Sequence, residues 1–280
     1  MPLYIVGTPL GNLGDFSPRA VEVLRACDFI AAEDTRVTMK LLARFAIHTP
    51  LVSYHEHNRL RSGAELVERL AAGQKGALVT DAGMPAVSDP GADLTAACAE
   101  RGIEVLVVPG PCAVSAAVAL SGFAAGRFCF EGFLSVTGKN RREHLASLKD
   151  ERRAMVFYEA PHKLIYTLRD MLAAWGDRRV SVSREMTKLH EQTLRGTLSG
   201  ALAHFERTPP RGEFTLVIEG AAPPKAAMPE DALAAALRYR EEGFSLRDAA
   251  RKAAEENGVS RRPVYEMLLK SCVENDDKGQ

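Results

Sequence analysis

The chain has 280 residues, of which 46% are hydrophobic and 26% charged, so its length and apolar content are those of a globular protein and exclude a disordered chain. Its 36 basic and 36 acidic side chains cancel, so no overall charge draws the chain to nucleic acid or to a membrane surface, and any basic surface must be local. Five cysteines without a CxxC pair, and the absence of any apolar stretch of membrane-spanning length, are typical of a reduced cytoplasmic protein.

The first part of the chain alternates short apolar runs with helical patterns, which predicts a parallel sheet covered by helices on both faces. The expected strands are 3–6, 28–32, 51–54, 77–80 and 103–108. The expected helices are 18–26, one that follows residue 34, 62–72, 91–101 and 114–120. Ser17, which precedes a proline, is suited to cap the first helix, and Asp34 or Thr35 the second.

Residues 76–91, GALVTDAGMPAVSDPG, lead from a buried strand into a loop rich in Gly, Pro and Asp, which we call the organising loop. Open α/β sheets bind ligands at the carboxyl ends of their strands. We interpret Asp81, Gly83 and Met84 as ligand contacts, because no cap or hairpin requires these residues there. Asp89, with a proline after it, has instead the pattern of a helix N-cap, so we expect it to start the next helix.

Other loops at strand ends are also polar. The first loop, GTPLGNLGD, has neither the dinucleotide-binding glycine spacing nor a P-loop lysine, so any nucleotide-like ligand must bind differently. The second strand ends in Glu33-Asp34-Thr35-Arg36, of which helix capping explains one residue. His55 and His57 form an HxH pair without a third ligand nearby, so we predict no metal site.

After Gly122 the pattern changes, and we place a boundary there between a parallel-sheet domain, 1–121, and a mixed α/β domain, 122–220. The strands expected in the second domain are 128–134, 155–158, 180–183, 190–194 and 214–218, with helices near 163–174 and 199–206. Six Lys or Arg stand against three Asp or Glu in the segment 136–153. This local excess makes Lys139, Arg141 and Arg142 candidates for contact with RNA.

The end of the chain has a different composition. We expect a linker rich in Pro and Ala at 221–229, a helical extension at 230–274 and a disordered tail at 275–280. The turn Asn257-Gly258-Val259 between two of its helices is compatible with a helix-turn-helix. Ten basic and eleven acidic residues from 225 onward do not indicate DNA binding, and a packing or dimerisation role fits equally.

The strings GTPLGNLGD, EDTR, VTDAGMPAVSDPG and VVPGP, in this order and spacing, resemble the tetrapyrrole methylase superfamily of S-adenosylmethionine-dependent enzymes. The later strings FYEAPHKL, SREMTKLHE and GEFTLVIEG are similar to the branch that methylates the ribose 2′-oxygen of a cytidine in the decoding region of bacterial 16S ribosomal RNA. This resemblance covers about residues 3–220. It implies a two-domain tetrapyrrole-methylase-like α/β fold with a helical extension, S-adenosylmethionine held between the domains, a homodimer, and 16S rRNA in the small subunit as substrate.

The resemblance also implies which residues serve the site. Motif position adds six cofactor contacts to those in the organising loop: Pro9, Cys112, Ala113, Tyr158, Glu159 and Arg184. Transfer to a ribose hydroxyl needs a group that takes up the hydroxyl proton, and the candidates are Glu33, Asp34 and Arg36. Glu185 and Lys188 are alternatives from the second domain, and Lys188 is also a candidate RNA contact.

Two other functions stay open at this point. A methyltransferase acting on carbon atoms of a corrinoid precursor would also use Arg36, Lys139 and Arg141 for a polycarboxylate substrate. The helical extension favours the ribosomal substrate, because a small substrate has no need of it. A non-catalytic RNA-binding relative is the second alternative, and the complete organising loop argues against it.

Overall fold

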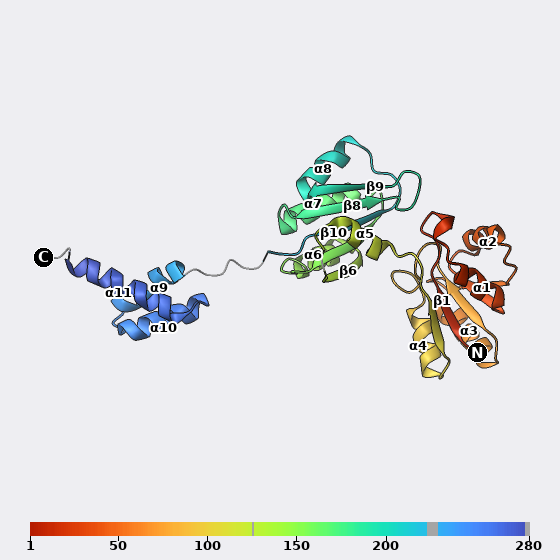
Figure 1. The fold of residues 1–280 in the computed structure, drawn as a ribbon, viewed down its shortest axis with the longest axis horizontal. Coiled ribbons are helices and arrows are strands. Elements are labelled where there is room, and N and C mark those ends of the chain that lie inside the picture. Colours follow the sequence, from red (N-terminus) through yellow and green to blue (C-terminus); the bar gives the residue numbers. More distant parts are fainter. Residues whose placement is uncertain (125, 223–228, 278–280) are drawn as a thin grey trace. The chain divides into compact units, whose positions relative to one another are not determined.

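The computed structural model describes residues 1–124, 126–222 and 229–277. The chain divides into two units, Met1–Ala221 and Ala222–Gln280. The first contains two five-stranded sheets and the second contains helices (Figure 1). Within the described ranges, no helix combines the length and the apolar character needed to cross a bilayer.

The first sheet is parallel throughout, as predicted. Its strand order is β3-β2-β4-β1-β5, and every neighbouring pair is parallel. The strands are β1 (Leu3–Val6), β2 (Phe29–Ala32), β3 (Leu51–Ser53), β4 (Gly76–Val79) and β5 (Val105–Val108). Because connections between parallel strands must cross over the sheet, the carboxyl ends of all five strands and the loops that follow them share one edge.

Helices cover both faces of this sheet, which confirms the second part of that prediction. The elements are η1 (Leu13–Asp15), α1 (Pro18–Ala26), α2 (Thr35–Arg44), α3 (Arg59–Ala71) and α4 (Ala92–Glu100). Ile30 and Val79 pack in the core that holds α1 and α2. Their neighbours Phe29 and Leu78 pack in the core that holds α3 and α4. Successive strand residues therefore serve opposite faces, as the strand period of two requires.

Two of the expected helix caps are confirmed and one is wrong. The Ser17 side chain accepts a hydrogen bond from the amide of Ala20, and the Asp34 carboxylate accepts one from the amide of Arg36. Asp89, however, does not start a helix, because α4 begins only at Ala92 and has Gly91 as its N-cap. The chain turns at Gly91, where φ is 149°, so Asp89 lies before the turn and faces a pocket instead.

The second sheet is mixed, as expected, with the order β6-β7-β10-β8-β9. Only β6 and β7 are parallel, and the other three pairs are antiparallel. The strands are β6 (Phe128–Phe133), β7 (Ala154–Glu159), β8 (Arg179–Arg184), β9 (Gln192–Thr197) and β10 (Phe214–Ile218). The prediction that a strand starts at His190 is wrong by two residues, because a turn in which the Thr187 amide donates to the Glu191 carboxylate precedes β9.

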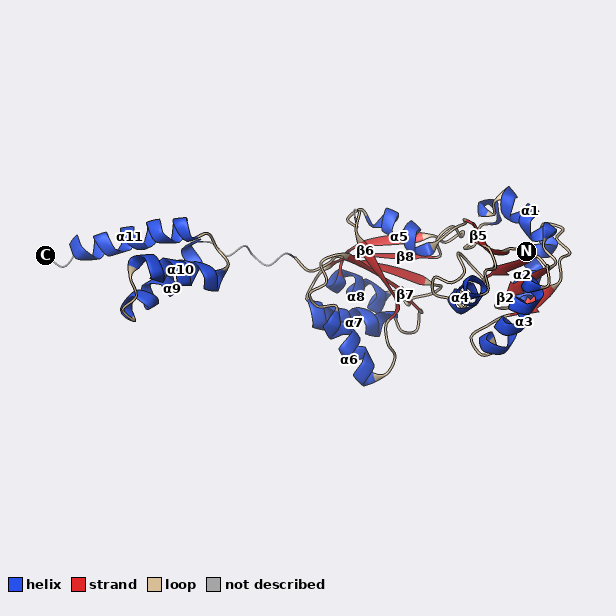
Figure 2. Cartoon of the chain, turned by 90° about the horizontal axis from the view of Figure 1, so that it is seen from below, coloured by secondary structure: helices blue, strands red, loops and turns tan. Residues whose placement is uncertain are grey.

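Helices lie on both sides of the second sheet (Figure 2). They are α5 (Ala113–Ser121), α6 (Gly138–Ser147), α7 (Leu164–Trp175) and α8 (Leu198–Arg207). The last three share one core, whereas Val114 and Ala117 of α5 pack with Val156 and Val217 on the other face. The boundary predicted after residue 121 therefore separates α5 from the sheet that it covers.

The second unit contains three described helices, α9 (Pro229–Glu241), α10 (Leu246–Asn257) and α11 (Arg261–Asp277), as the pattern predicted. Alanines dominate the core between them, and Ser245 caps α10 by accepting from the amide of Asp248. The tail predicted to be disordered from residue 275 is helical as far as Asp277, since no Gly or Pro interrupts the chain before Gly279. Residues 223–228 of the expected linker, and 278–280, lie outside the described residues.

Candidate functional site: a pocket at the strand ends

The organising loop is hydrogen-bonded to the loop that follows β1. Thr8 and Gly83 exchange two backbone hydrogen bonds, with N···O distances of 2.9 and 3.1 Å. The Thr8 hydroxyl also donates to the carbonyl oxygen of Thr80, at 3.0 Å. β1 and β4 are neighbouring parallel strands, and beyond their ends these bonds form a separate antiparallel bridge that holds the two loops together.

Gly7 and Gly110 allow a third loop, the one after β5, to pack against the loops after β1 and β4. A Cβ atom on Gly7 would lie 2.7 Å from both the Cα of Gly110 and the sulfur of Met84. A Cβ atom on Gly110 would lie 2.9 Å from the backbone of Gly7. The loops after β1 and β5 therefore touch through backbone atoms, and this contact accounts for Gly7, one of the first-loop glycines that fit no nucleotide-binding pattern.

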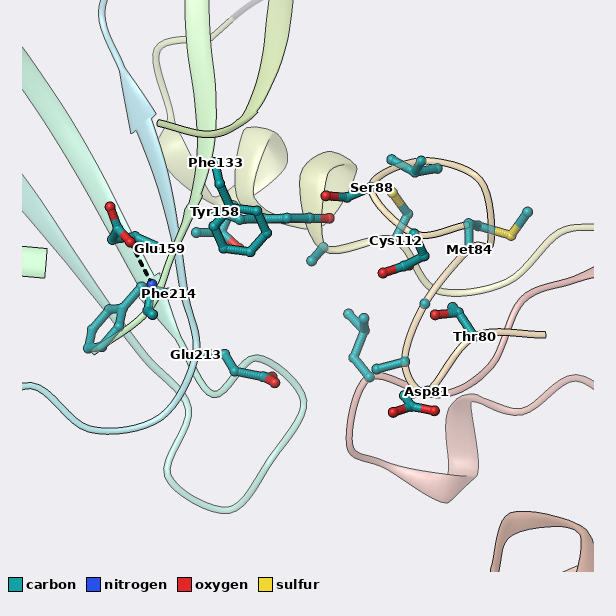
Figure 3. A pocket seen from close by; sticks show the side chains of 18 of the residues that line it. Thr80, Asp81, Met84, Ser88, Cys112, Phe133, Tyr158, Glu159, Glu213 and Phe214 are labelled. Carbon is teal, nitrogen blue, oxygen red and sulfur yellow. Dashed lines mark hydrogen bonds between the residues drawn. The ribbon is translucent and has the colours of Figure 1, made fainter. Parts of the chain in front are cut away.

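A cavity of about 390 Å³ lies between these loops and strand ends of the second sheet, all within the first unit. Figure 3 shows Asp81, Thr80, Met84 and Cys112 on one side, with Tyr158 on the other. Cavities of this size hold small ligands and cofactors. The remaining lining residues are Leu10, Glu33, Ala82, Gly83, Val87, Ser88, Asp89, Ala113, Phe133, Glu159, Ala160, Pro161, Glu213, Phe214 and Thr215.

The cavity brings together most of the residues that the sequence suggested for the cofactor. Those that line it are Asp81, Gly83, Met84, Cys112, Ala113, Tyr158 and Glu159. Pro9 is buried beside the cavity, and its neighbour Leu10 lines it. Arg184 lies on β8 opposite Phe214 and is not among the lining residues.

Sequence reasoning missed several lining residues. Ser88 and Asp89 belong to the organising loop itself, so its composition could have indicated them. Glu213 and Phe214 stand where β10 begins, in the string GEFTLVIEG. Phe133 at the end of β6 carried no sequence indication, because it reads as one more apolar residue of a strand.

Carboxylates gather on the organising-loop side of the cavity. Burial raises the pKa of Asp81 above its usual value, although the carboxylate accepts a hydrogen bond from the amide of Asp34 at 3.2 Å. Burial likewise raises the pKa of Asp89. Glu33 accepts a hydrogen bond from the Thr80 hydroxyl at 3.0 Å. When ionised, these three side chains suit a positively charged ligand.

The other two catalytic candidates pair with each other outside the cavity. Arg36 lies 2.6 Å from the carboxylate of Asp34, and its side chain is 85% exposed. Hydrogen bonds from Arg36 lower the pKa of Asp34 to about 2. Neither residue lines the cavity, so Glu33 is the member of this group that faces it.

On the second sheet, a hydrogen-bonded chain holds the buried carboxylate of Glu159. It accepts from the amide of Ala160 at 2.8 Å and from the Thr167 hydroxyl at 2.5 Å. The guanidinium of Arg141 donates to that same hydroxyl oxygen at 2.9 Å and to Asp170 at 2.6 Å. The Arg141 side chain is thus occupied inside the domain, unlike the exposed Arg142 beside it.

Lys188 lies beside a smaller cavity that shares Glu213 with the first. Its Nζ is 3.1 Å from Glu185 and 3.3 Å from Glu213. Burial lowers its pKa, but both carboxylates raise it, and the net shift is upward. Its aliphatic stem lies against Gly11, where a Cβ atom would collide with it. Over the described part of the chain, no group of three or more His, Cys, Asp or Glu side chains is arranged to hold a metal ion.

Two relatives that are similar in sequence, and one solved structure that is similar in fold, are named methyltransferases. A protein from Synechocystis sp. named "Ribosomal RNA small subunit methyltransferase I" is 50% identical over 270 residues, 95% of this chain and 97% of that protein. A Thermotoga maritima protein of the same name is 52% identical over 218 residues, 78% of this chain and 98% of that protein. The solved structure of cobalt precorrin-4 methyltransferase is similar in fold, with a TM-score of 0.56 and 16% identity, over 78% of this chain and 94% of that one.

The family assignment rests on the part of the chain that builds most of the cavity. Residues 2–202 match the sequence profile of the Tetrapyrrole (Corrin/Porphyrin) Methylases. This range contains the organising loop, both glycines of the backbone contact and the aromatic strand ends of β6 and β7. The resemblance of the motifs is confirmed, and the chain belongs to the tetrapyrrole (corrin/porphyrin) methylase family.

Proposed function

We propose that this chain transfers a methyl group from S-adenosylmethionine to the ribose 2′-oxygen of a cytidine in small-subunit ribosomal RNA. The observation that carries this proposal is the cavity between the organising loop and the second sheet. The names of its relatives support an rRNA substrate, since proteins 50% and 52% identical to it are named for small-subunit rRNA methylation.

The lining residues fit S-adenosylmethionine by size and by charge. The cofactor is a cation at sulfur and carries an ammonium group, and Asp81, Asp89 and Glu33 offer carboxylates to such a ligand. The backbone around Gly83 approaches the cavity without a side chain, and Met84 and Tyr158 supply apolar surface. When bound, the cofactor supplies a methyl group on an excellent sulfonium leaving group.

The protein's main task is then to hold the acceptor oxygen in line with that methyl group, since positioning alone can supply much of a rate enhancement. As the oxygen–methyl bond forms, the hydroxyl proton needs an acceptor. Glu33 serves this role in our proposal, because it faces the cavity and has a hydrogen bond from Thr80 that orients its carboxylate. Asp34 and Arg36 neutralise each other, and Lys188 is held between two carboxylates.

RNA contact rests on Lys139 and Arg142 in our proposal, because both side chains are exposed on α6. Lys139 forms a 3.8 Å ion pair with Glu143, which solvent screens strongly. Arg141, the third residue of the expected patch, is already bonded to Asp170 and Thr167, and we leave it out.

The helical extension does not decide between a ribosomal and a corrinoid substrate. The Thermotoga protein matches this chain over almost all of its own length, yet leaves more than a fifth of this chain unmatched. A relative of that name therefore does without a segment as long as the helical unit. The likeness to cobalt precorrin-4 methyltransferase shows the fold alone, and gives the corrinoid alternative no support.

Transfer of tritiated methyl groups to 30S subunits, to free 16S rRNA and to a corrinoid precursor tests the proposal. We expect label in the RNA, and mapping of the modified nucleotide should place it on a cytidine ribose. Label in the corrinoid alone would refute an RNA substrate. Glu33→Gln should lower kcat far more than it weakens cofactor binding, since it keeps the shape of the side chain and two of three carboxylates but cannot accept the proton at neutral pH.

We further propose, from the resemblance, that two copies assemble as a homodimer in the cytoplasm, where the ribosomal substrate is found. Light scattering of the purified protein measures the mass of the assembly directly. A mass of one chain at micromolar concentration would refute the dimer.

A further inference from the structure

An aromatic side chain is exposed at the rim of the cavity. Phe133, the last residue of β6, lines the cavity, yet 57% of its surface is open to solvent. Tyr158 beside it is mostly enclosed, and Phe214 on the same side of the cavity is only 2% exposed (Figure 3). Phe133 is thus the aromatic ring of this cavity that an incoming molecule meets from outside.

An irregularity in β6 aims this ring at the cavity. Residues three apart on a regular strand point to opposite faces of the sheet. Phe130 and Phe133 nevertheless both contact Tyr158, with ring centroids at 5.0 and 5.8 Å. The register of β6 against β7 shifts between Phe130 and Gly132, and Gly132 has a φ of 65°. This β-bulge reverses the direction of the side chains at the end of the strand, so that Phe133 lies on the same face of the sheet as Phe130.

The glycine of the bulge is there for backbone conformation, not for space. A Cβ atom on Gly132 would find nothing within 4 Å. Glycine adopts a positive φ more readily than any other residue, so Gly132 permits the bulge that directs the Phe133 side chain. Bulges of this kind are frequent next to active sites, where they re-aim a side chain.

The ring is supported on one side and free on the other. Tyr158 meets both phenylalanine rings in edge-to-face geometry, with interplanar angles of 66° and 62°. These contacts hold the Phe133 ring in place while more than half of its surface stays available. A flat ligand could therefore stack on it without displacing a protein contact.

We propose that Phe133 is a stacking platform for an unpaired nucleobase of the RNA substrate, which places the attached ribose at the mouth of the cavity. This inference rests on the proposed function and names the contact by which that site takes its substrate. Proteins read single-stranded RNA by stacking splayed bases on aromatic side chains. The exposed cations Lys139 and Arg142 follow Phe133 on the next helix, where they can meet the phosphates of the same strand.

The adenine of the cofactor is the competing occupant of this ring. A cofactor enclosed in the cavity meets the rings of its interior, such as Tyr158. A base that belongs to a long RNA arrives from solvent and meets the rim. The exposure of Phe133 therefore favours the RNA base.

The test compares Phe133→Leu with Phe128→Leu, a matched control on the same strand that is 40% exposed and does not line the cavity. We expect Phe133→Leu to lower kcat/KM for 30S subunits on the order of ten- to a hundredfold, because one base–aromatic stack is removed. Its cofactor affinity, measured by calorimetry, should stay at the parent value. Phe133→Tyr keeps a ring and should restore most of the activity. Unchanged kcat/KM in Phe133→Leu, or an equal loss of cofactor affinity, overturns the proposal.

A second measurement does not depend on methyl transfer. In Phe133→Trp, oligocytidylate stacked on the new ring should quench its fluorescence, above the background of the buried Trp175. No quenching, or equal quenching in Phe128→Trp, overturns the stacking surface. If the parent fails to methylate any RNA while the quenching persists, the proposed function fails and the stacking surface stands.

Discussion

Replacement of Gly83 by alanine isolates the contribution of the organising loop to cofactor binding. Gly83 has a φ of 88°, in the left-handed region that an L-residue adopts at a cost of about 1–2 kcal/mol. Its Cβ would lie 3.2 Å from Leu10, which lines the cavity, and 3.5 Å from the carbonyl oxygen of Pro111. The loop can relieve this strain by moving, but it then loses the backbone pair with Thr8.

Gly102→Ala is the matched control. Gly102 also has a positive φ, 66°, but a Cβ there meets nothing within 4 Å, and the residue does not line the cavity. Gly102→Ala should lose about 1–2 kcal/mol in the free energy of unfolding by urea, and Gly83→Ala should lose less if its loop moves to relieve the strain. Binding must then restore the strained loop, and if the whole 1–2 kcal/mol is restored at that step, S-adenosylmethionine binding in Gly83→Ala weakens by roughly 5- to 30-fold.

Calorimetric titration of both folded variants with S-adenosylmethionine tests whether the loop conformation at Gly83 supports cofactor binding. We expect the weaker affinity in Gly83→Ala alone, with Gly102→Ala at the parent value. Equal affinities in the two variants would show that the loop conformation at Gly83 does not support the cofactor. A loss in both would point to a general loosening of the sheet.

Three further outcomes follow from side chains around the cavity. The ionised carboxylate of Asp81 attracts a cation, and burial raises its pKa, so the affinity for S-adenosylmethionine should rise as the pH passes this pKa and then level off. Calorimetry at several pH values should find a smaller rise in Asp81→Asn. Thr167→Val removes a hydrogen bond from the buried carboxylate of Glu159 and should lower the free energy of unfolding by about 1–3 kcal/mol. Thr167→Ser keeps the hydroxyl and should be about as stable as the parent. Equal stability of the two variants would contradict a role for that hydrogen bond. Changing both Lys139 and Arg142 to alanine should reduce the log–log salt slope of RNA binding by about 0.7–0.9 for each phosphate that the protein no longer neutralises, with cofactor affinity as the control.

Local patterns predicted the first sheet well, because its strands, helices and the caps at Ser17 and Asp34 are encoded by residues close in sequence. The same local reasoning failed at Asp89, where an N-cap pattern is present but the glycine at position 91 turns the chain before the helix begins. Which sheet a helix covers depends on distant residues, so the small side chains of α5 did not reveal that they pack on the second sheet.

In the candidate site, too, features set by residues close in sequence could be predicted, and features set by distant residues could not. The organising loop could be found from its composition, because no cap or hairpin requires Asp81, Gly83 and Met84 after a buried strand. The local basic excess made Arg141 a candidate RNA contact, and only the fold brings Asp170 and Thr167 to it. Phe133 could not be predicted, since its direction depends on a bulge that a single glycine introduces into β6.

The strand order of the second sheet affects how the chain can fold while the ribosome synthesises it. β10 is the last strand in sequence, yet it occupies the centre of the sheet between β7 and β8, and all five of its residues are buried. Until residue 218 has emerged, β7 and β8 therefore lack the neighbour that joins them, and both present unpaired edges. At a synthesis rate of about 5–20 residues per second, the interval between the end of β8 at Arg184 and the end of β10 lasts a few seconds. During it the nascent chain should depend on chaperones, while the first sheet, complete by Val108, can already fold.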